Sequence, residues 1–312
     1  HQSVTVEMLI CRNQSALLSL SVARFGQRNA LFSRNLVLPN PEGGSGGGDA
    51  TIDRSEVSKF SAIGKAWWNR AGEMKPLHSY NKLRIDFLSS MTAQHVRKPE
   101  EAQLALRGLK IVDVGCGGGI LSEPLSALGA HVTGIDASGA NISIALEHAR
   151  STGLTPIEEG QPLPADSPDA SGGSLRYLHR TAGDLLRSEE GQAGFDLVVC
   201  SEVLEHVSDV PRMMEDLCGL VKPGGGLLLT TMDRSMLSFL LTIVAAEQVL
   251  GLVPQGTHHW DKYIPPRQLS GLVSANGLRP ARLVGAAYDP LFDRWFAVPS
   301  TLVNYMLFAH RP

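Results

Sequence analysis

Hydrophobic positions along the chain fall into short apolar runs separated by stretches with helical spacing. Seven of these runs have the length and residue types of buried strands, and they lie at 109–114, 131–135, 175–179, 195–200, 226–231, 281–286 and 302–308. Between the first three runs, the apolar positions of 121–128 and 140–150 recur with the period of a helix. This βαβ order predicts an α/β fold with a mostly parallel, seven-stranded sheet and helices on both faces.

Two further helical patterns precede the predicted sheet, one over 57–68 and the other over 83–88. We therefore expect one domain over 53–312 that begins with helices and continues into the sheet. Within it, the segment 155–174 is rich in Pro, Gly, Asp and Ser and is predicted to be a surface insertion.

The first 38 residues differ in character from the rest of the chain. Between residues 8 and 38 every charged side chain is an arginine, and serine and leucine lie between them. An acid-free segment rich in Arg and Ser is typical of mitochondrial targeting. We therefore expect 1–38 to be a removable transit peptide, with a plain disordered tail as the alternative, and the Gly-rich stretch 39–52 to be a flexible linker.

Net charge and cysteine spacing argue against two kinds of ligand, namely nucleic acid and a zinc ion held by cysteines. The formal net charge is -3 and the isoelectric point is about 6.4, so no overall basic field attracts nucleic acid, and we expect no nucleic-acid partner. The four cysteines are scattered and form no CxxC pair. Their spacing therefore does not indicate a zinc site.

The segment 113–119, DVGCGGG, follows an apolar strand and opens a predicted helix. Glycines there let the backbone approach a ligand at the positive end of a helix, although such a turn also serves tight packing. Asp136 ends the next strand, where a carboxylate can accept hydrogen bonds from both hydroxyls of a ribose. The pattern resembles the glycine loop of class I methyltransferases, which implies a Rossmann-like fold and S-adenosylmethionine as cofactor.

Asp184 follows the third predicted strand. Class I methyltransferases often place an acid here to bind the adenine amino group, so Asp184 is a candidate cofactor contact. The alternative is that Asp184 caps the helix that follows it. Both interpretations stay open from sequence alone.

A second polar segment, SEVLEHV at 201–207, leaves the carboxyl end of the fourth predicted strand. Open α/β sheets bind their ligands at this edge. If the segment is helical from Glu202 onward, the side chains of Glu202, Glu205 and His206 project from one face. Two carboxylates and an imidazole suit a hard divalent cation, Mg²⁺ or Mn²⁺ before Zn²⁺. A solvated helix start without metal is the alternative.

Two outer motifs carry a more specific resemblance. The run WWNRAGEMKPLH at 67–78, followed by NKLR at 81–84, resembles the amino-terminal segment of the ubiquinone-biosynthesis O-methyltransferases, and VPQGTH at 253–258 resembles a later segment of them. The resemblance covers about residues 55–308. It implies O-methylation of a catechol hydroxyl on a polyprenylated dihydroxybenzoate and of a hydroxyl on demethylubiquinol.

The resemblance also implies roles for single residues. By this resemblance, the residues expected to contact the cofactor are Arg84, Gly115, Asp136 and Ser201. The residues expected to bind a divalent metal, most readily Mg²⁺, are Glu202, Glu205 and His206. Arg84 would pair with the carboxylate of the cofactor, with a solvated surface charge as the alternative.

Methyl transfer from a sulfonium requires the phenol oxygen to lie in line with the S–CH₃ bond. A bound metal would lower the pKa of the phenol. Without metal, His206 or one of the two glutamates, Glu205 among them, is the candidate general base. His258 and His259 are further candidates from a late loop, which is otherwise an ordinary polar loop.

The stretch at about 235–262 forms an apolar insertion, interrupted by Glu247 and Gln248. A membrane span needs about 20 uninterrupted apolar residues, so we expect a helix that docks on a bilayer or lines a substrate tunnel, with a core helix as the alternative. The family resemblance implies a polyprenylated phenolic substrate, peripheral contact with the matrix side of the mitochondrial inner membrane, and a multi-enzyme ubiquinone-biosynthesis complex. A methyltransferase for another hydrophobic phenol, or a noncatalytic lipid-binding assembly protein on the same fold, stays open.

Overall fold

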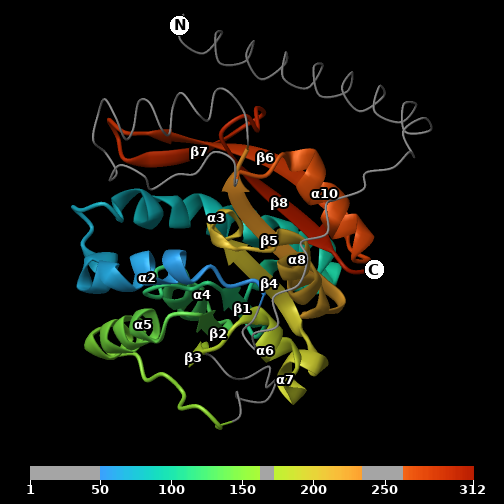
Figure 1. Ribbon diagram of the computed structural model, residues 1–312. Coiled ribbons are helices and arrows are strands. Elements are labelled where there is room, and N and C mark those ends of the chain that lie inside the picture. The colour runs from blue at the N-terminus through green and yellow to red at the C-terminus, as the bar shows by residue number, and fades with distance from the viewer. Residues whose placement is uncertain (1–49, 162–171, 234–262) are drawn as a thin grey trace, which may run out of the picture. The chain divides into compact units, whose positions relative to one another are not determined.

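An eight-stranded sheet runs through the part of the chain that the computed structural model describes, residues 50–161, 172–233 and 263–312 (Figure 1). The strands in chain order are β1 Lys110–Val114, β2 His131–Asp136, β3 Ser174–His179, β4 Phe195–Ser201, β5 Val221–Met232, β6 Arg279–Asp289, β7 Arg294–Val298 and β8 Asn304–His310. Their order across the sheet is β3-β2-β1-β4-β5-β8-β6-β7. Strands β1 to β5 are parallel to one another, and β8, β6 and β7 add three antiparallel neighbours.

The predicted α/β fold with a mostly parallel sheet is confirmed, but the sheet has one strand more than the predicted seven within the described residues. The additional strand is β7, which pairs only with β6 at the edge of the sheet. None of its side chains is fully buried. Its residues therefore lack the buried apolar run on which the prediction of the other strands relied.

Helices cover both faces of the sheet. The α-helices are α2 Arg54–Ile63, α3 Lys75–His95, α4 Ser122–Ala127, α5 Gly139–Ser151, α6 Ala182–Leu186, α7 Glu189–Ala193, α8 Val210–Gly219 and α10 Pro266–Ala275. Three 3-10 helices accompany them, η1 Gly64–Trp68, η2 Pro99–Leu104 and η3 Leu204–His206. The two helical patterns expected before the sheet correspond to α2 with η1 and to α3. Asp53 caps α2 by accepting a hydrogen bond from the backbone N–H of Ser55 at 3.0 Å.

Alternate residues of the central strand divide the core into two layers. Val198 and Cys200 of β4 pack with residues of α6, α8 and α10, whereas Leu197 and Val199 pack with residues of α3, α4 and α5. In Figure 1, α4 and α5 accordingly lie on one side of the strands and α8 and α10 on the other. Because all four of these side chains are buried, β4 is hydrophobic along its whole length, as parallel strands generally are.

Three neighbouring strands bring the polar segments of the sequence together. In the order β2-β1-β4, each strand ends at the same edge of the sheet. Asp136 ends β2, Gly115 follows β1, and Ser201 ends β4. The backbone of Gly115 has a φ of 74°, a conformation that favours glycine, which lets the chain turn sharply out of β1. The edge expected to bind ligands therefore carries the predicted site residues.

Several expectations fall outside the described residues. They concern the segment 1–38, most of 39–52, the centre of the insertion at 155–174, and the apolar insertion at about 235–262 with its two histidines. Contacts group Gly48–Pro312 into one unit. Within the described residues, no helix combines the length and the apolar character needed to pass through a bilayer.

Asp113 is a buried acid inside β1. It is 2% exposed, and its Oδ2 accepts a hydrogen bond from the hydroxyl of Ser122 at 2.6 Å. Burial raises the pKa of Asp113 to about 6, although Ser122 and the positive charge of Arg84 act in the opposite direction. The folded protein therefore binds this proton more tightly than the unfolded chain, in which an aspartate titrates near pH 4.

We predict that Asp113→Asn stabilises the fold at pH 7 but not at pH 4. The pKa of Asp113 is higher in the folded protein than in the unfolded chain, so its protonated form stabilises the fold below about pH 4, and this stabilisation is lost as the pH rises through about 6. Asparagine mimics the protonated form at every pH. Each pKa unit of difference corresponds to about 1.4 kcal/mol, so the expected gain at pH 7 is about 1–3 kcal/mol. Urea unfolding of both proteins at the two pH values measures it. A gain that is equal at both pH values would contradict the prediction, and Asp86→Asn, at a side chain 60% exposed, is the surface control.

Candidate functional site

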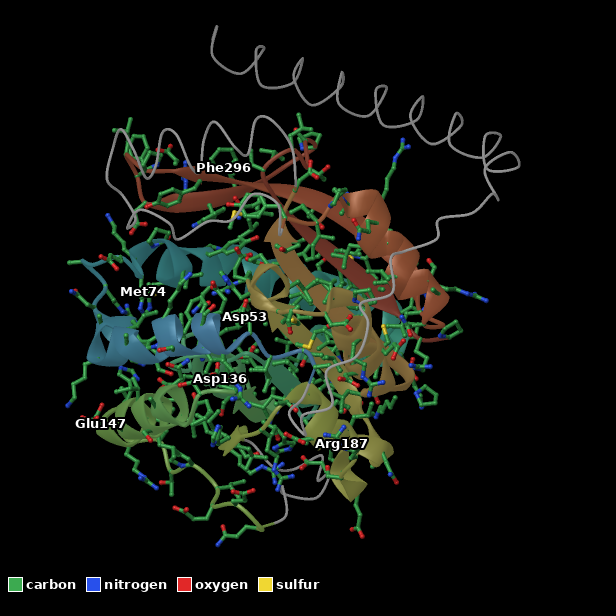
Figure 2. All side chains as sticks on the ribbon, viewed as in Figure 1. Asp53, Met74, Asp136, Glu147, Arg187 and Phe296 are labelled. Atoms are coloured by element: carbon green, nitrogen blue, oxygen red, sulfur yellow. The ribbon has the colours of Figure 1, made fainter. Side chains whose placement is uncertain are left out.

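A cavity of about 1230 Å³ opens at the carboxyl edge of the parallel strands. Its walls come from α2 and α3, the glycine loop after β1, the ends of β2 and β4, and the β6–β7 hairpin. Asp53 and Asp136, both labelled in Figure 2, lie on its wall. Seven of the predicted site residues line it together: Arg84, Gly115, Asp136, Ser201, Glu202, Glu205 and His206.

Asp136 is held by hydrogen bonds from the loops on both sides of it. Its Oδ2 accepts from the backbone N–H of Gly117 at 2.9 Å, and its Oδ1 accepts from the backbone N–H of Ser138 at 2.8 Å and from the amide of Asn141 at 3.2 Å. An ionised carboxylate offers about four acceptor positions, so Asp136 retains acceptor capacity toward the cavity. Burial raises its pKa, and these three donors lower it.

The Trp-Trp pair that precedes α3 packs against the glycine loop. The indole N–H of Trp67 donates to Asn141 at 3.1 Å, and that of Trp68 donates to the carbonyl of Gly118 at 2.8 Å. A Cβ at Gly117 would lie 2.7 Å from the Trp67 ring. The glycine is therefore required by a side chain as well as by its own φ of 55°.

A directed chain of hydrogen bonds starts at Arg84, whose side chain is 4% exposed. Its Nη1 donates to the Ser201 hydroxyl at 2.7 Å, and the Thr230 hydroxyl donates to Glu202 at 2.6 Å. Ser201 and Thr230 lie 2.7 Å apart, and because the single proton of Thr230 goes to Glu202, Ser201 must donate to Thr230. The chain thus orients four side chains from α3, β4, β5 and the turn after β4. Burial lowers the pKa of Arg84, and the charges of Glu202 and Asp113 raise it.

The segment after β4 is not the α-helix that the sequence suggested. Glu202 has a φ of 57°, in the left-handed region, and only the short helix η3 follows it. The side chains of Glu202, Glu205 and His206 therefore do not share one helical face. The expected arrangement was wrong because the chain turns sharply at Glu202 before any helical hydrogen bond can form.

The two glutamates nevertheless lie close enough for their charges to interact. Glu205 is 4% exposed; its Oε2 accepts from the Thr231 hydroxyl at 2.7 Å, and its Oε1 has no hydrogen-bond partner. Burial raises the pKa of both carboxyls, and the charge of Glu202 raises that of Glu205 further. The pair can therefore bind a proton near neutral pH.

His206 is turned toward a residue that sequence reasoning missed. Its Nδ1 lies 2.9 Å from Oε2 of Glu56, on α2, and its ring packs edge-on against Phe60. The charges of Lys59 and His206 keep the pKa of Glu56 below its usual value despite burial. Across residues 50–161, 172–233 and 263–312, no three His, Cys, Asp or Glu side chains come together in a way that would hold a metal ion. The predicted three-residue metal set is thus not assembled here.

Asp184 does not line the cavity. The backbone N–H of Thr181 donates to its carboxylate at 3.4 Å, and the backbone N–H of Asp184 donates to the Thr181 hydroxyl at 3.0 Å, which forms a capping box at the start of α6. A further ion pair joins it to Arg187 at 2.7 Å. Asp184 thus stabilises the start of α6 from the third helical position, with Thr181 as the N-cap residue, and its contact with the adenine stays a prediction.

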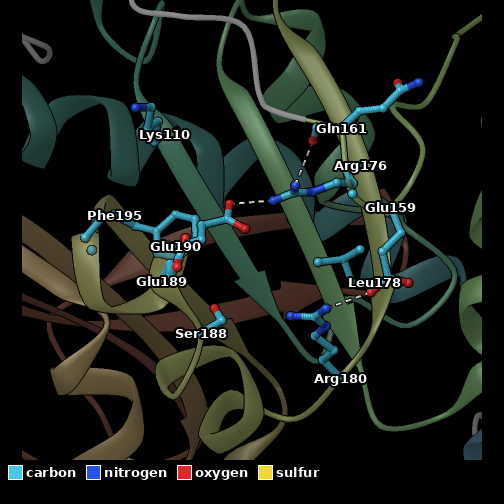
Figure 3. Close-up of a pocket in the computed structure, with 13 residues that line it drawn as sticks. Lys110, Glu159, Gln161, Arg176, Leu178, Arg180, Ser188, Glu189, Glu190 and Phe195 are labelled. Carbon is cyan, nitrogen blue, oxygen red and sulfur yellow. Dashed lines mark hydrogen bonds and ion pairs between the residues drawn. The ribbon is translucent and has the colours of Figure 1, made fainter.

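A second pocket, of about 620 Å³, lies beside β3 and α7. Figure 3 shows Arg176 directed toward Glu190 and Arg180 toward Glu159, and each of these pairs is hydrogen-bonded. Its two arginines are thus paired with neighbouring acids. The larger cavity, which joins the glycine loop to the acidic turn after β4, is the candidate active site.

Known proteins similar to this chain are methyltransferases. A family profile described as "Methyltransferase domain" matches residues 80–283. A ubiquinone biosynthesis O-methyltransferase of Methylobacterium nodulans is 40% identical over 262 residues, which cover 84% of this chain and 96% of that protein. One of the same name from Rhizobium etli is 37% identical over 266 residues, or 85% of this chain and 98% of that protein.

Among solved structures, the magnesium protoporphyrin IX methyltransferase of Synechocystis PCC 6803 with bound SAH is 19% identical, with a TM-score of 0.49. The match covers 83% of this chain and 94% of that one.

The relatives correct one expectation from the sequence. The similar proteins from Methylobacterium, Azorhizobium, Rhizobium and Agrobacterium are bacterial. Bacteria have no mitochondria, so the expected location on the matrix side of a mitochondrial inner membrane was wrong. An Arg- and Ser-rich composition without acids is only a statistical feature of targeting segments. For predicting the location of the protein, this composition was therefore less reliable than the resemblance of residues 55–308 to known methyltransferases.

We predict that Asp136→Asn weakens S-adenosylmethionine binding by about 10- to 100-fold, because charge-assisted hydrogen bonds to ribose hydroxyls contribute about 1.5–3 kcal/mol each. Asp184→Asn, at an acid outside the cavity, is the matched control and should bind within about twofold of the unchanged protein. Isothermal titration calorimetry of the three proteins measures both. Equal losses in the two variants would show that Asp184 contacts the cofactor after all.

Proposed function

Because the chain belongs to the ubiquinone biosynthesis O-methyltransferases, which depend on S-adenosylmethionine, we propose that it methylates a hydroxyl of a polyprenylated dihydroxybenzoate and of demethylubiquinol. One observation carries this proposal: a single cavity joins the glycine loop and Asp136 to the acidic turn after β4. A cofactor and a phenol bound there would share one enclosed space. Apolar side chains, among them Val203, Met213, Met232 and Trp295, line the same cavity and suit a ring with a hydrocarbon tail.

The first task of these residues is positioning. Asp136 and the glycine loop would hold the ribose of the cofactor, and the buried guanidinium of Arg84 would hold its carboxylate. Ser201 fixes the orientation of Arg84 through the hydrogen bond at 2.7 Å. Holding both reactants with the oxygen in line with the S–CH₃ bond supplies most of the rate advantage in such a transfer.

The second task is removal of the phenol proton, which we assign to Glu205. Its Oε1 is buried in the cavity wall without a partner, and burial beside Glu202 raises its pKa. A carboxylate whose pKa approaches the operating pH is a better base than an ordinary glutamate. His206, which also lines the cavity, is the alternative base.

We further propose that the site binds a hard divalent cation, most readily Mg²⁺. Glu202 and Glu205 fit such an ion, since their carboxylates interact in the cavity wall and, within the described residues, one oxygen of Glu205 lacks a donor. His206 does not join them, because its Nδ1 faces Glu56. When bound, the cation would favour the phenolate form of the acceptor.

We predict that Glu205→Gln lowers kcat for acceptor methylation by about 10²- to 10⁴-fold, the range for loss of a general base. Affinity for S-adenosylmethionine should stay within about twofold. The matched control is Glu123→Gln, which changes another buried glutamate, one that is bonded to His148 outside the cavity. Single-turnover assays with a short-tailed dihydroxybenzoate measure the rates. A variant that retains a tenth of the activity would exclude Glu205 as the base.

Chelation tests the cation separately. We expect activity to fall at least tenfold after treatment with EDTA and to return on addition of Mg²⁺, because a cation held by Glu202 and Glu205 would favour the phenolate form of the acceptor. The same titration on Glu202→Gln should need more Mg²⁺ for recovery. An unchanged rate after chelation would remove the cation from the proposal and leave Glu205 as an unassisted base.

A further inference from the structure

Tyr80 is a buried side chain of the cavity wall, and its hydroxyl has no hydrogen-bond partner among residues 50–161, 172–233 and 263–312. It lies on α3 and is 1% exposed. The Thr230 hydroxyl is near enough to lower the pKa of Tyr80, but its single proton goes to Glu202 and its oxygen already accepts from Ser201. A buried hydroxyl without a partner is unfavourable for the protein alone. It therefore points to a ligand that completes the hydrogen bond.

Packing on several sides fixes the direction of this hydroxyl. The Tyr80 ring stacks on Trp295 of β7, with centroids 4.2 Å apart, and the guanidinium of Arg84 lies 5.0 Å from the ring centre. Trp295 is itself held by a hydrogen bond from its indole N–H to the carbonyl of Pro76 at 3.0 Å. The phenol group is thus a rigid part of the wall before any ligand binds.

The charges around Tyr80 determine what its hydroxyl can do. Burial raises the pKa of Tyr80 well above its usual value, and the carboxylates of Glu202 and Glu205 raise it further, against the effect of Arg84. The hydroxyl therefore keeps its proton at neutral pH. It can donate that proton to an oxygen of a ligand, but it cannot serve as the base for the reaction.

We propose that Tyr80 donates a hydrogen bond to the acceptor oxygen adjacent to the hydroxyl that is methylated. The proposal rests on the proposed function, in which the acceptor is a catechol-type ring. A donor on the reacting oxygen would occupy a lone pair and weaken the nucleophile, whereas a donor on its neighbour orients the ring without that penalty. Tyr80 would thus select rings with two adjacent oxygens, because a site built to hydrogen-bond a substrate atom discriminates against analogues that lack it.

The test compares the unchanged protein with Tyr80→Phe on two acceptors, a short-tailed dihydroxybenzoate with adjacent hydroxyls and the same ring with only the reacting hydroxyl. We expect kcat/KM of the variant to fall about 10- to 100-fold on the first acceptor and to stay within about twofold on the second. Affinity for S-adenosylmethionine should not change. The melting temperature should not fall, since phenylalanine keeps the ring and removes an unsatisfied hydroxyl. Equal losses on both acceptors, a loss of cofactor affinity, or a lowered melting temperature would each overturn the proposal.

Tyr177→Phe is the matched control, because Tyr177 is also buried with an unpartnered hydroxyl but lies outside the cavity. It should behave as the unchanged protein on both acceptors. Binding of the dihydroxybenzoate in the presence of S-adenosylhomocysteine requires no turnover and should weaken at least tenfold in Tyr80→Phe. A ring that binds in this Tyr80-dependent way but is not methylated would refute the proposed function and support the hydrogen bond. Equal binding by the two proteins would refute the hydrogen bond.

Discussion

The site depends on the burial of one positive charge, the guanidinium of Arg84. Taking such a group out of water is expensive unless its donors are satisfied and opposite charges lie nearby. Here Nη1 binds Ser201, Nη2 binds the carbonyl of Leu77, Glu202 supplies negative charge, and Nε is left for a ligand. These requirements join α3 to the end of β4 and the turn after it. The helix before the core is therefore part of the active site and not an accessory to it.

The same charge explains how half-buried Glu202 and buried Glu205 can lie together in the cavity wall. From Arg84 the hydrogen bonds run through Ser201 and Thr230 to Glu202 in one direction. A chain of this kind polarises each member and favours negative charge at its far end. Glu205 lies outside the chain, and the Thr231 hydroxyl and its own backbone N–H lower its pKa less than burial and the charge of Glu202 raise it. The environment thus favours ionisation of Glu202 over that of Glu205, which is how a pair of like residues acquires different roles.

Sequence reasoning located the parts of this site that depend on strand ends. β1, β2 and β4 are buried on both faces, so their apolar runs were visible, and the position of Asp136 and Ser201 at a common edge follows from parallel pairing. The acidic turn was not predictable in the same way. The spacing of Glu202, Glu205 and His206 suits a helix, but the left-handed backbone at Glu202 depends on contacts made by the folded chain. Partners such as Glu56 and Thr230 are distant in sequence, and no local pattern marks them.

Polar atoms without hydrogen-bond partners in the cavity wall restrict which ligands can bind there, beyond what the shape of the cavity does. Tyr80 Oη, Arg84 Nε and Glu205 Oε1 are each buried without a partner, and all three side chains line the cavity. A phenolic hydroxyl and a guanidinium donate, whereas an ionised carboxylate accepts. In the proposed reaction the carboxylate of the cofactor accepts from Arg84, whereas a phenol with an adjacent oxygen accepts from Tyr80 and offers its proton to Glu205. A purely apolar ring would leave Tyr80 and Glu205 unpaired and would bind less well. The polar end of the cavity therefore selects the chemistry of the acceptor, and the apolar wall selects its size.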